Sequence, residues 1–431
     1  LDDVNKIIDV ELDKYESTKQ KSKHIVREII KRKRTSVNDM IKLYEKRGIS
    51  PDLIKAEAKG FGVGIDVPDN FYAMVSELHE KSEKKHVIKK ELDIDLKGVA
   101  PTEVLYYDDY SKINFKARVL RQEGRFVVLD KTYFYPTSGG QVHDIGSIGA
   151  GKVENVVREG DCIVHIMDSD KKLLTGKEVY CIIDKERRIQ LAQHHTGAHI
   201  LNAAAKRVLG NHVNQAGAHK DIDRARLDIT HYAALSETEI SKIEEEANKI
   251  INEKINVSKS FMDRDEAEKS FGVEIYQGGV IPGEKLRIVN IPEVDVEACG
   301  GTHLNNTAEA GMIKILKSSK ISDSIVRIEY VAGNAAVNQS GKEEDILNEA
   351  ANILGVGKKS VAMKAAEVFE LWKNVVKKNR DIPKKLSGAD SVGEEELTDK
   401  EILEKTAHLL KTQIEHVPKT LKRFLKEIDA K

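Results

Sequence analysis

The first 90 residues have the hydrophobic spacing of amphipathic helices. Apolar side chains recur there at steps of three and four residues, as in Val4, Ile7, Ile8 and Leu12. The segments GISPD and GFGVGIDVPD that follow are typical of turns. The pattern predicts a helical region over residues 1–90.

Residues 91–183 follow a different pattern, in which short apolar runs such as FKARVL, RFVVLD and CIVHIM are separated by clusters of Gly and Asp. Short strands joined by tight turns predict a small antiparallel β-barrel. The glycine-rich segment KTYFYPTSGGQVHDIGSIG lies within this region and lacks the Lys-Ser/Thr pair of a Walker phosphate loop. We therefore interpret it as a structured turn.

Residues 184–338 combine helical and strand-like patterns. A helix is predicted from Asp184 to Leu209 with Gly210 after its end, and a second helix opens with the capping pair Ser236 and Glu239. The strand-like runs KLRIVNI, MIKILK and VRIEYVAG come later in the chain. This order predicts an α+β layer in which the helices pack on a sheet.

The last region, residues 339–431, repeats a helical pattern. The segment that begins at Asp345 aligns with the segment that begins at Glu401, at an offset of 56 residues. We predict two helical hairpins. Because two such repeats bury little apolar area alone, we expect them to pack on another subunit or on the rest of the chain. The predicted fold class is thus a multidomain α+β protein of these four regions.

Composition narrows the function classes. The chain has 431 residues with 70 Lys and Arg against 71 Asp and Glu, so any nucleic-acid surface must come from local clusters of charge. Three cysteines are too few for a disulfide framework. No apolar run is long enough for a membrane span, and the start lacks a signal peptide. We expect a cytoplasmic protein without a membrane partner, and, because the first segment begins within a helical pattern, a fragment of a longer chain.

Two short segments predict a metal site. QLAQHHTGAHIL places His195 and His199 four residues apart, on one face of the predicted helix, although a histidine pair alone can also face solvent. EACGGTHL holds Cys299 and His303, and the glycines between them permit a tight turn. Three imidazoles and a thiolate suit tetrahedral zinc. We predict one zinc ion per chain, bound by these four residues.

Three other candidate ligands have structural interpretations. Cys162 and Cys181 lie in strand-like apolar runs, where a cysteine packs as a small hydrophobic side chain. His194 precedes His195 by one residue, so it points away from the face that His195 shares with its partner. We expect all three residues to serve the fold rather than to bind the ion.

The HTGAH and CGGTH elements, in this order and at this separation, resemble the editing domain of alanyl-tRNA synthetases and of the related stand-alone alanyl-tRNA editing proteins. FYPTSGGQVHDIG, NHVNQAG, RARLDIT and SIVRIEYVAGNAA are similar to further segments of that family. Threonyl-tRNA synthetase editing domains share related zinc motifs, but FYPTSGGQ and VRIEYVAG favour the alanyl branch. LYEKRGISPDL resembles the end of the synthetase's tRNA-recognition region, in an archaeal-like form.

This resemblance implies hydrolysis of the ester that joins serine or glycine to tRNA(Ala). A polar side chain that binds the serine hydroxyl would be left unpaired by alanine, which would spare the correct product. Gln215 is the first candidate for that role, with Thr196 and Thr302 behind it, and the alternative for Gln215 is that it caps a turn. Four protein ligands would close a tetrahedral site, so we expect either a weakly held fourth ligand or a zinc ion that mainly positions the substrate.

The resemblance also implies contacts with tRNA. The residues expected to make them are Lys31, Arg32, Lys33, Arg34, Glu45, Lys314, Lys317, Lys320 and Arg327. Glu45 stands where the family usually has Asp, a residue associated with reading the acceptor-stem G·U pair. The basic run that contains residues 31–34 has a second interpretation as a solvated helix face.

We interpret the chain as the C-terminal portion of an alanine–tRNA ligase: a tRNA-recognition region, the barrel and zinc core of the editing domain, and a helical dimerisation and tRNA-binding domain. The aminoacylation domain, which would use ATP, is expected to be absent. The expected partners are tRNA(Ala) and a second copy of the chain, and no DNA. The alternatives are a stand-alone editing deacylase and a zinc-stabilised RNA-binding module without catalysis.

Overall fold

The computed structural model describes residues 94–276, 284–377 and 397–430 without interruption, together with helix α3 (Pro51–Gly60) and scattered positions before residue 94. The chain divides into two compact units, Leu1–Gly98 and Val99–Lys431. Among the residues described in these ranges, no helix combines the length and the apolar character that crossing a membrane requires.

The first unit has a hydrophobic core of its own. The described positions at 25–27 and 39–41 are helical, as is α3, which agrees with the predicted helical region at these places. The core residues are Val26, Met40, Ile41, Ile49, Ile54, Ala58 and Ile65.

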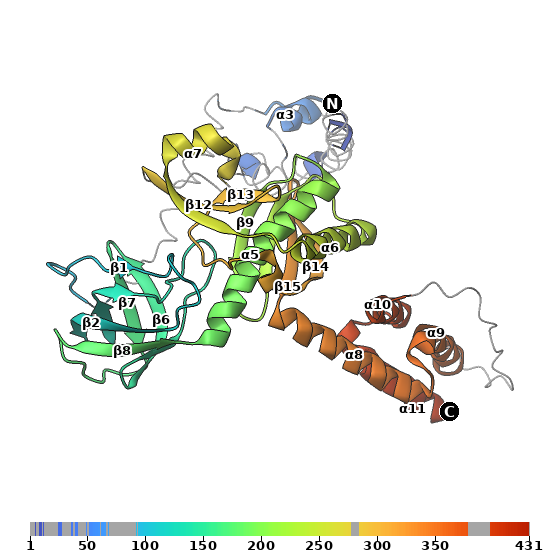
Figure 1. The fold of residues 1–431 in the computed structure, drawn as a ribbon. Helices are drawn as coiled ribbons and strands as arrows, with labels where there is room; N and C mark the ends of the chain where they lie inside the picture. The colour runs from blue at the N-terminus through green and yellow to red at the C-terminus, as the bar shows by residue number, and fades with distance from the viewer. Residues whose placement is uncertain are drawn as a thin grey trace. The chain divides into compact units, whose positions relative to one another are not determined.

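The second unit begins with the predicted antiparallel barrel (Figure 1). Around the barrel the strands are β2 (Asn114–Glu123), β3 (Phe126–Leu129), β7 (Cys162–Met167), β6 (Gly151–Glu159), β5 (Gly146–Ile148) and β8 (Glu178–Ile183), and β8 pairs with β2 to close it. The short strands β1 (Glu103–Val104) and β4 (Lys131–Thr132) pair in parallel beside it. Gly124 and Gly160 make tight turns at positive φ, where other residues are strained.

The barrel interior is apolar and contains Cys181. Phe115, Ala117 and Val119 point inward from alternate positions of β2. Cys162 and Cys181 are buried at 5% and 0% exposure, which confirms their predicted packing role. Burial raises the pKa of the Cys181 thiol to about 12, so this side chain stays neutral.

Helix α5 (Lys185–Leu209) follows the barrel directly and is buried along most of its length. The side chain of Asp184 accepts the backbone N–H of Arg187 and so caps the first turn, and Gly210 follows the last. The helix packs against β9, β10, β15 and the second helix α6 (Glu237–Asn252). Because α5 is enclosed on several sides, its polar side chains lie in the protein interior.

Two antiparallel sheets complete the core. One has the order β14 (Ile313–Ser322), β15 (Ile325–Ala332), β10 (Ala225–Thr230) and β9 (Gln215–Lys220). The other has the order β11 (Ser258–Asp263), β12 (Lys285–Ile291) and β13 (Asp295–Ala298), with α7 (Arg264–Phe271) packed on β11 and β12. The strands predicted from KLRIVNI, MIKILK and VRIEYVAG are confirmed, as is the capping box of Ser236 and Glu239 that opens α6.

A buried ion pair joins α5 to the loop that follows β4. Arg188 is fully buried and pairs with Asp144, and its guanidinium also donates to the backbone oxygen of Tyr110 at 2.8 Å. Asp144 in turn accepts the backbone N–H of Tyr135 at 2.6 Å. These contacts hold the SGGQ segment of the loop in a fixed place beside α5.

The C-terminal helices form a four-helix unit. They are α8 (Asn334–Leu354), α9 (Val361–Trp372), α10 (Asp399–Leu410) and α11 (Val417–Asp429). The offset predicted from the repeat is kept even at the helix ends, where Gly355 and Lys411 both adopt the left-handed conformation. The two hairpins share one hydrophobic core that includes Leu347, Leu403 and Phe424. They therefore bury their apolar stripes on each other, and the unit also packs on the rest of the chain, as predicted, where α8 contacts β15 and Glu343 pairs with Lys314.

Candidate metal centre

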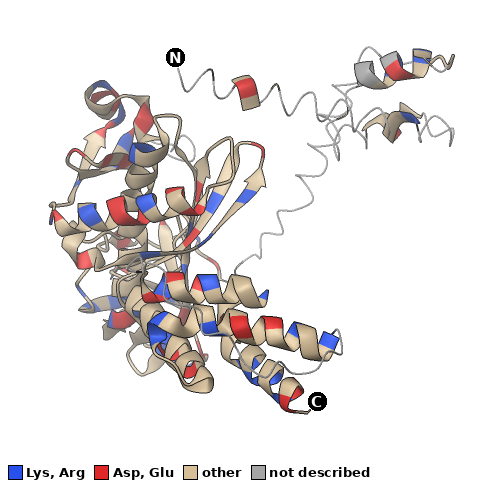
Figure 2. Ribbon diagram, turned by 90° about the vertical axis from the view of Figure 1, so that its right-hand side faces the viewer, with Lys and Arg blue, Asp and Glu red and all other residues tan. Residues whose placement is uncertain are grey.

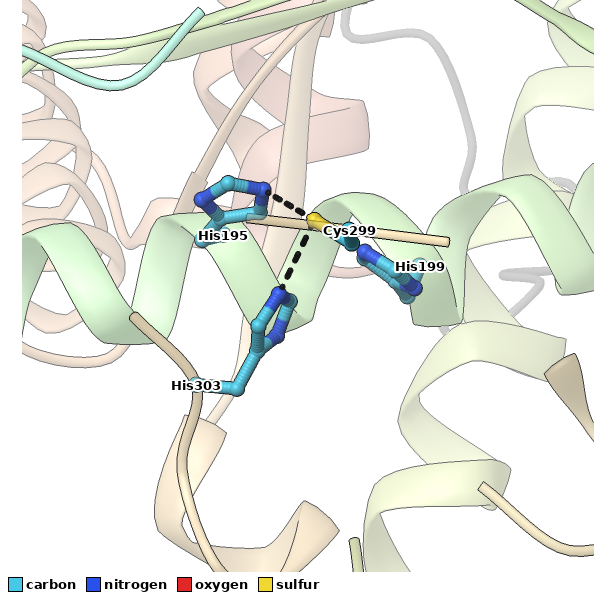
Figure 3. Close-up of side chains that lie close together, drawn as sticks. All are labelled: His195, His199, Cys299 and His303. Carbon is cyan, nitrogen blue, oxygen red and sulfur yellow. Dashed lines mark hydrogen bonds between the residues drawn. The ribbon is translucent and has the colours of Figure 1, made fainter. Parts of the chain in front are cut away.

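Two segments far apart in the sequence meet at one point. His195 and His199 lie one turn apart on α5, and Cys299 and His303 lie on the turn that follows β13 (Figure 3). The four donor atoms all lie within 4.8 Å of one another. Cys299 Sγ is 3.3 Å from Nε2 of His195 and 3.3 Å from Nε2 of His303. The predicted convergence of the four side chains is confirmed.

The protonation of His195 follows from its neighbours. The backbone N–H of Thr302 lies 3.2 Å from Gln141 Oε1, and an N–H only donates, so this atom is the amide oxygen. The same oxygen lies 2.7 Å from His195 Nδ1. Because an amide oxygen only accepts, Nδ1 carries the proton and Nε2 presents its lone pair to the centre.

His199 is held in the same way by a carboxylate. Its Nδ1 donates to Asp295 Oδ2 at 2.7 Å, and its Nε2 lies 3.4 Å from Glu297 Oε2. Metal-bound histidines usually donate their second N–H to a carboxylate or carbonyl group, which fixes the ring and makes the free nitrogen a better donor. His195 and His199 both have this arrangement.

His303 is positioned from α5. Its Nδ1 lies 3.3 Å from the hydroxyl of Thr196, and that hydroxyl also accepts the backbone N–H of Leu304. Lys259 donates to the backbone oxygen of His303 at 3.3 Å. The ring is thus fixed at Nδ1 by Thr196, with Nε2 toward Cys299.

The electrostatics of the cluster favour a cation. Burial acts to raise the pKa of the Cys299 thiol, but His195 and His199 outweigh it and hold the pKa well below its usual range. Burial lowers the pKa of His195 and His303 well below the usual value, which leaves both rings neutral. The pKa of His199 is raised, because Glu297 and Asp295 overcome the effect of burial. A metal ion at the centre would replace the His199 proton.

At two positions near this centre, neighbouring atoms lie so close to the backbone that only glycine fits. A Cβ on Gly301 would lie 1.9 Å from Cε1 of His195, so any side chain would displace that ring. A Cβ on Gly140 would lie 2.1 Å from the backbone oxygen of Ala218, and the φ of Gly140 is +73°. The CGGTH and SGGQ motifs therefore need glycine for steric reasons.

Sequence reasoning missed four residues of the site, namely Gln141, Lys220, Asp295 and Glu297. Lys220 is 2% exposed, and its ammonium donates to the backbone oxygen of Gly139 at 3.4 Å. Burial lowers the pKa of Lys220 and raises that of Glu297 to about 8, and the two groups partly offset each other. A glutamine directly after two turn glycines was the only signal for Gln141, and it did not reveal its partner.

Thr196, Thr302 and Gln215 are the predicted candidates for reading the serine hydroxyl. Thr196 and Thr302 are fully buried, and their hydroxyls are engaged with His303 and with Gln141. These two threonines therefore position the imidazoles. Gln215 begins β9 and pairs with Ile229, and its role stays a prediction.

His194 has the structural role that was expected of it. Its Nδ1 lies 2.6 Å from the backbone oxygen of Asp221, and its Nε2 contacts Gln190. Burial lowers the pKa of His194 to about 4, so the ring is neutral. These contacts tie α5 to the end of β9.

Three of the residues expected to contact tRNA have partners within the protein, and one of them, Lys320, donates to the backbone oxygen of Tyr232 at 2.8 Å. Arg327 forms a bidentate pair with Asp228 on the neighbouring strand, at 2.7 and 2.8 Å. Lys314 is buried against Glu343 of α8, so the expectation that it contacts phosphate is wrong. Lys31, Arg32, Lys33, Arg34 and Glu45 lie outside the described residues.

Comparison with known proteins gives the family. Residues 1–187 match the family model described as tRNA synthetases class II (A), and residues 286–329 match the threonyl and alanyl tRNA synthetase second additional domain. An alanine–tRNA ligase of Methanococcus maripaludis (strain C5) is 38% identical over 387 residues, which are 88% of this chain and 43% of the relative. The chain belongs to the alanyl-tRNA synthetase family.

Further relatives agree. Alanine–tRNA ligases of Ignicoccus hospitalis and Pyrococcus abyssi are 40% and 41% identical over 392 and 397 residues, which cover 88% and 90% of this chain. The chain spans 43% of the length of each of these alanyl-tRNA synthetases. The second additional domain match includes Cys299 and His303, and His195 and His199 lie between the two matched segments.

The Gly301→Ala substitution tests the geometry of the centre. The new methyl group would push the His195 ring away from Cys299, so we expect the affinity for a divalent metal to fall by about 10-fold to 100-fold. Competition with a chromogenic chelator measures this affinity. The control is Gly217→Ala, where the nearest atom to the new Cβ is Asp228 Oδ2 at 3.6 Å. Wild-type affinity in a folded Gly301→Ala variant would contradict the assignment.

Proposed function

We propose that this chain binds tRNA(Ala) and hydrolyses serine or glycine that has been wrongly attached to its 3′ end. The observation that carries the proposal is the cluster of three imidazoles and one thiolate in a member of the alanyl-tRNA synthetase family. We also infer that the chain is the C-terminal, editing portion of such an enzyme, whose attachment of alanine would require ATP at another domain. A cytoplasmic location and homodimerisation through α8–α11 stay predictions.

We infer that the cluster holds one zinc ion. The donor set of nitrogen and sulfur suits this metal. The hydrogen bond that Nδ1 of His195 donates leaves its Nε2 free, and a metal ion would replace the proton on Nε2 of His199, whose Nδ1 donates to Asp295. When bound, zinc can polarise the ester carbonyl or lower the pKa of a water molecule. His195, Cys299 and His303 would hold the ion, and His199 would complete the set.

The burial of the four side chains indicates from which side a substrate would reach the metal centre. His195, His199 and His303 are each 1% exposed, whereas Cys299 is only half-buried. A substrate would therefore reach the centre past Cys299. Hydrolysis adds the hydroxyl of water to the ester carbonyl carbon and returns the proton to the released ribose oxygen. The buried polar groups beside the cluster would orient the ester for this attack.

Selection against alanine follows from hydrogen bonding. A synthetic pocket for alanine rejects one added hydroxyl poorly, so a second site must recognise that hydroxyl. We infer that Gln215, a polar side chain at the start of β9, binds it. Alanine would leave the glutamine unpaired and would be spared.

Release of serine from Ser-tRNA(Ala) tests the proposed activity. We expect the purified chain to release serine, a chelator to abolish the release, and added zinc to restore it. Cys299→Ala should lower the rate at least about tenfold through loss of the ligand. Cys162→Ala, which removes a cysteine of the barrel, should leave the rate unchanged.

An absence of serine release in that assay would favour one of the alternative functions. If the chain carries a full complement of zinc and still releases no serine, the function is that of a zinc-stabilised RNA-binding module. A free-standing editor and a synthetase portion would both release serine, and they differ in whether the natural reading frame continues upstream of Leu1.

A second experiment addresses the choice of amino acid. Gln215→Ala should lower the ratio of Ser-tRNA(Ala) to Ala-tRNA(Ala) hydrolysis by about threefold to tenfold, the value of one hydrogen bond. Parallel rate measurements on the two substrates give this ratio. Gln339→Ala on α8 is the matched control. An unchanged ratio would exclude Gln215 as the residue that reads the hydroxyl.

A further inference from the structure

A group of aromatic and cationic side chains lies beside the turn that carries Cys299 and His303. We call it the Phe261 platform, and it consists of Tyr107, Lys259, Phe261 and Arg287. Phe261 lies on β11 directly opposite Arg287 on β12, and Lys259 is two residues from Phe261 on the same face of the strand. The other face of this sheet, with Leu286 and Ile288, packs with Ala267 of α7.

Arg287 ties the platform to the metal centre. Its Nη1 donates to the backbone oxygens of Cys299 at 2.8 Å and Gly301 at 3.0 Å. The guanidinium lies 4.7 Å from the centroid of the Tyr107 ring, and that ring meets Phe261 edge-to-face at 5.8 Å. The aromatic rings therefore have a fixed position relative to the turn that carries the ligands.

The ring of Phe261 is 59% exposed, although it belongs to a strand beside a buried site. Tyr107 is half-buried below it. Lys259 donates to the backbone oxygens of His303 and Leu304 at 3.3 and 3.1 Å, so a second cation is held at the same edge. Arg287 is 8% exposed and holds the platform in place, whereas Lys259 is only half-buried. An exposed aromatic face with such a cation beside it has the chemistry that binds single-stranded nucleic acid, through base stacking and phosphate attraction.

The distribution of charged residues over the rest of the described chain bears on how a nucleic acid would bind. In the view of Figure 2, Lys and Arg are interspersed with Asp and Glu along the described elements, and the whole chain has 70 basic and 71 acidic residues. Recognition of a nucleic acid close to the centre must therefore depend on a few placed groups rather than on the overall field.

We propose that the Phe261 platform binds the terminal bases of the single-stranded 3′ end of tRNA, with a base stacked on the exposed ring of Phe261. This inference rests on the proposed editing function. The stacked base would fix the position of the terminal ribose beside Cys299, where the ester is hydrolysed. Phe261 is thus a substrate-binding residue that a motif search for metal ligands does not detect.

Phe261→Ala tests this inference in the full chain. Loss of one stacking contact should raise the KM for Ser-tRNA(Ala) about fivefold or more. Phe261→Trp keeps an aromatic face and should retain a KM close to wild type. Tyr180→Ala removes an aromatic ring of the barrel that is 50% exposed, and serves as the matched control. An unchanged KM for Phe261→Ala, with unchanged metal content, would overturn the proposal.

A direct binding measurement separates this inference from the editing function. The probe is an unacylated seven-nucleotide RNA that ends in CCA, and the comparison is the same RNA with an abasic final residue. The tryptophan of Phe261→Trp should be quenched by the first RNA and less by the second, and wild type, with Trp372 alone, should show no change. If wild type releases no serine but the quenching occurs, the editing function fails and the platform stands. Equal responses to the two RNAs would exclude stacking of the last base.

Discussion

The structure depends on the hydrogen bonds that fix the imidazoles of the metal centre. Gln141 accepts from Nδ1 of His195, and Asp295 accepts from Nδ1 of His199. The bond to Gln141 leaves the lone pair of His195 on Nε2, which faces Cys299. The bond to Asp295 fixes the ring of His199, whose raised pKa keeps a proton on Nε2 that a metal ion would replace. Without these partners the two rings could rotate or change tautomer, and the four donors would not share one point. The buried position of α5 is what makes such partners necessary.

Three separate regions of the chain contribute to this constraint. The loop after β4 supplies Gln141, α5 supplies two imidazoles, and the segment from Asp295 to His303 supplies the remaining donors. The pair of Arg188 and Asp144 holds the loop against α5, and the absence of a side chain at Gly301 lets the turn approach the helix. The barrel is therefore part of the metal site, because its neighbouring loop orients one of the ligands.

Local signals predicted much of this arrangement. The α5 limits, the capping box of α6, the barrel strands and the 56-residue repeat depend on nearby residues, and the structure confirmed them. The contributions of Gln141 and Lys220 could not be predicted, because their partners are set by tertiary packing. The same limit explains the wrong expectation for Lys314, whose charge is taken up by Glu343 on a helix that follows later in the chain.

The most direct test of the account is X-ray absorption spectroscopy at the zinc edge of the purified chain. Three imidazole nitrogens at about 2.0 Å and one sulfur at about 2.3 Å from a single zinc ion are expected. Replacement of Cys299 by alanine should remove the sulfur signal and leave the nitrogen shell. A zinc environment without sulfur, or a chain that binds no zinc when it is supplied, would contradict the account.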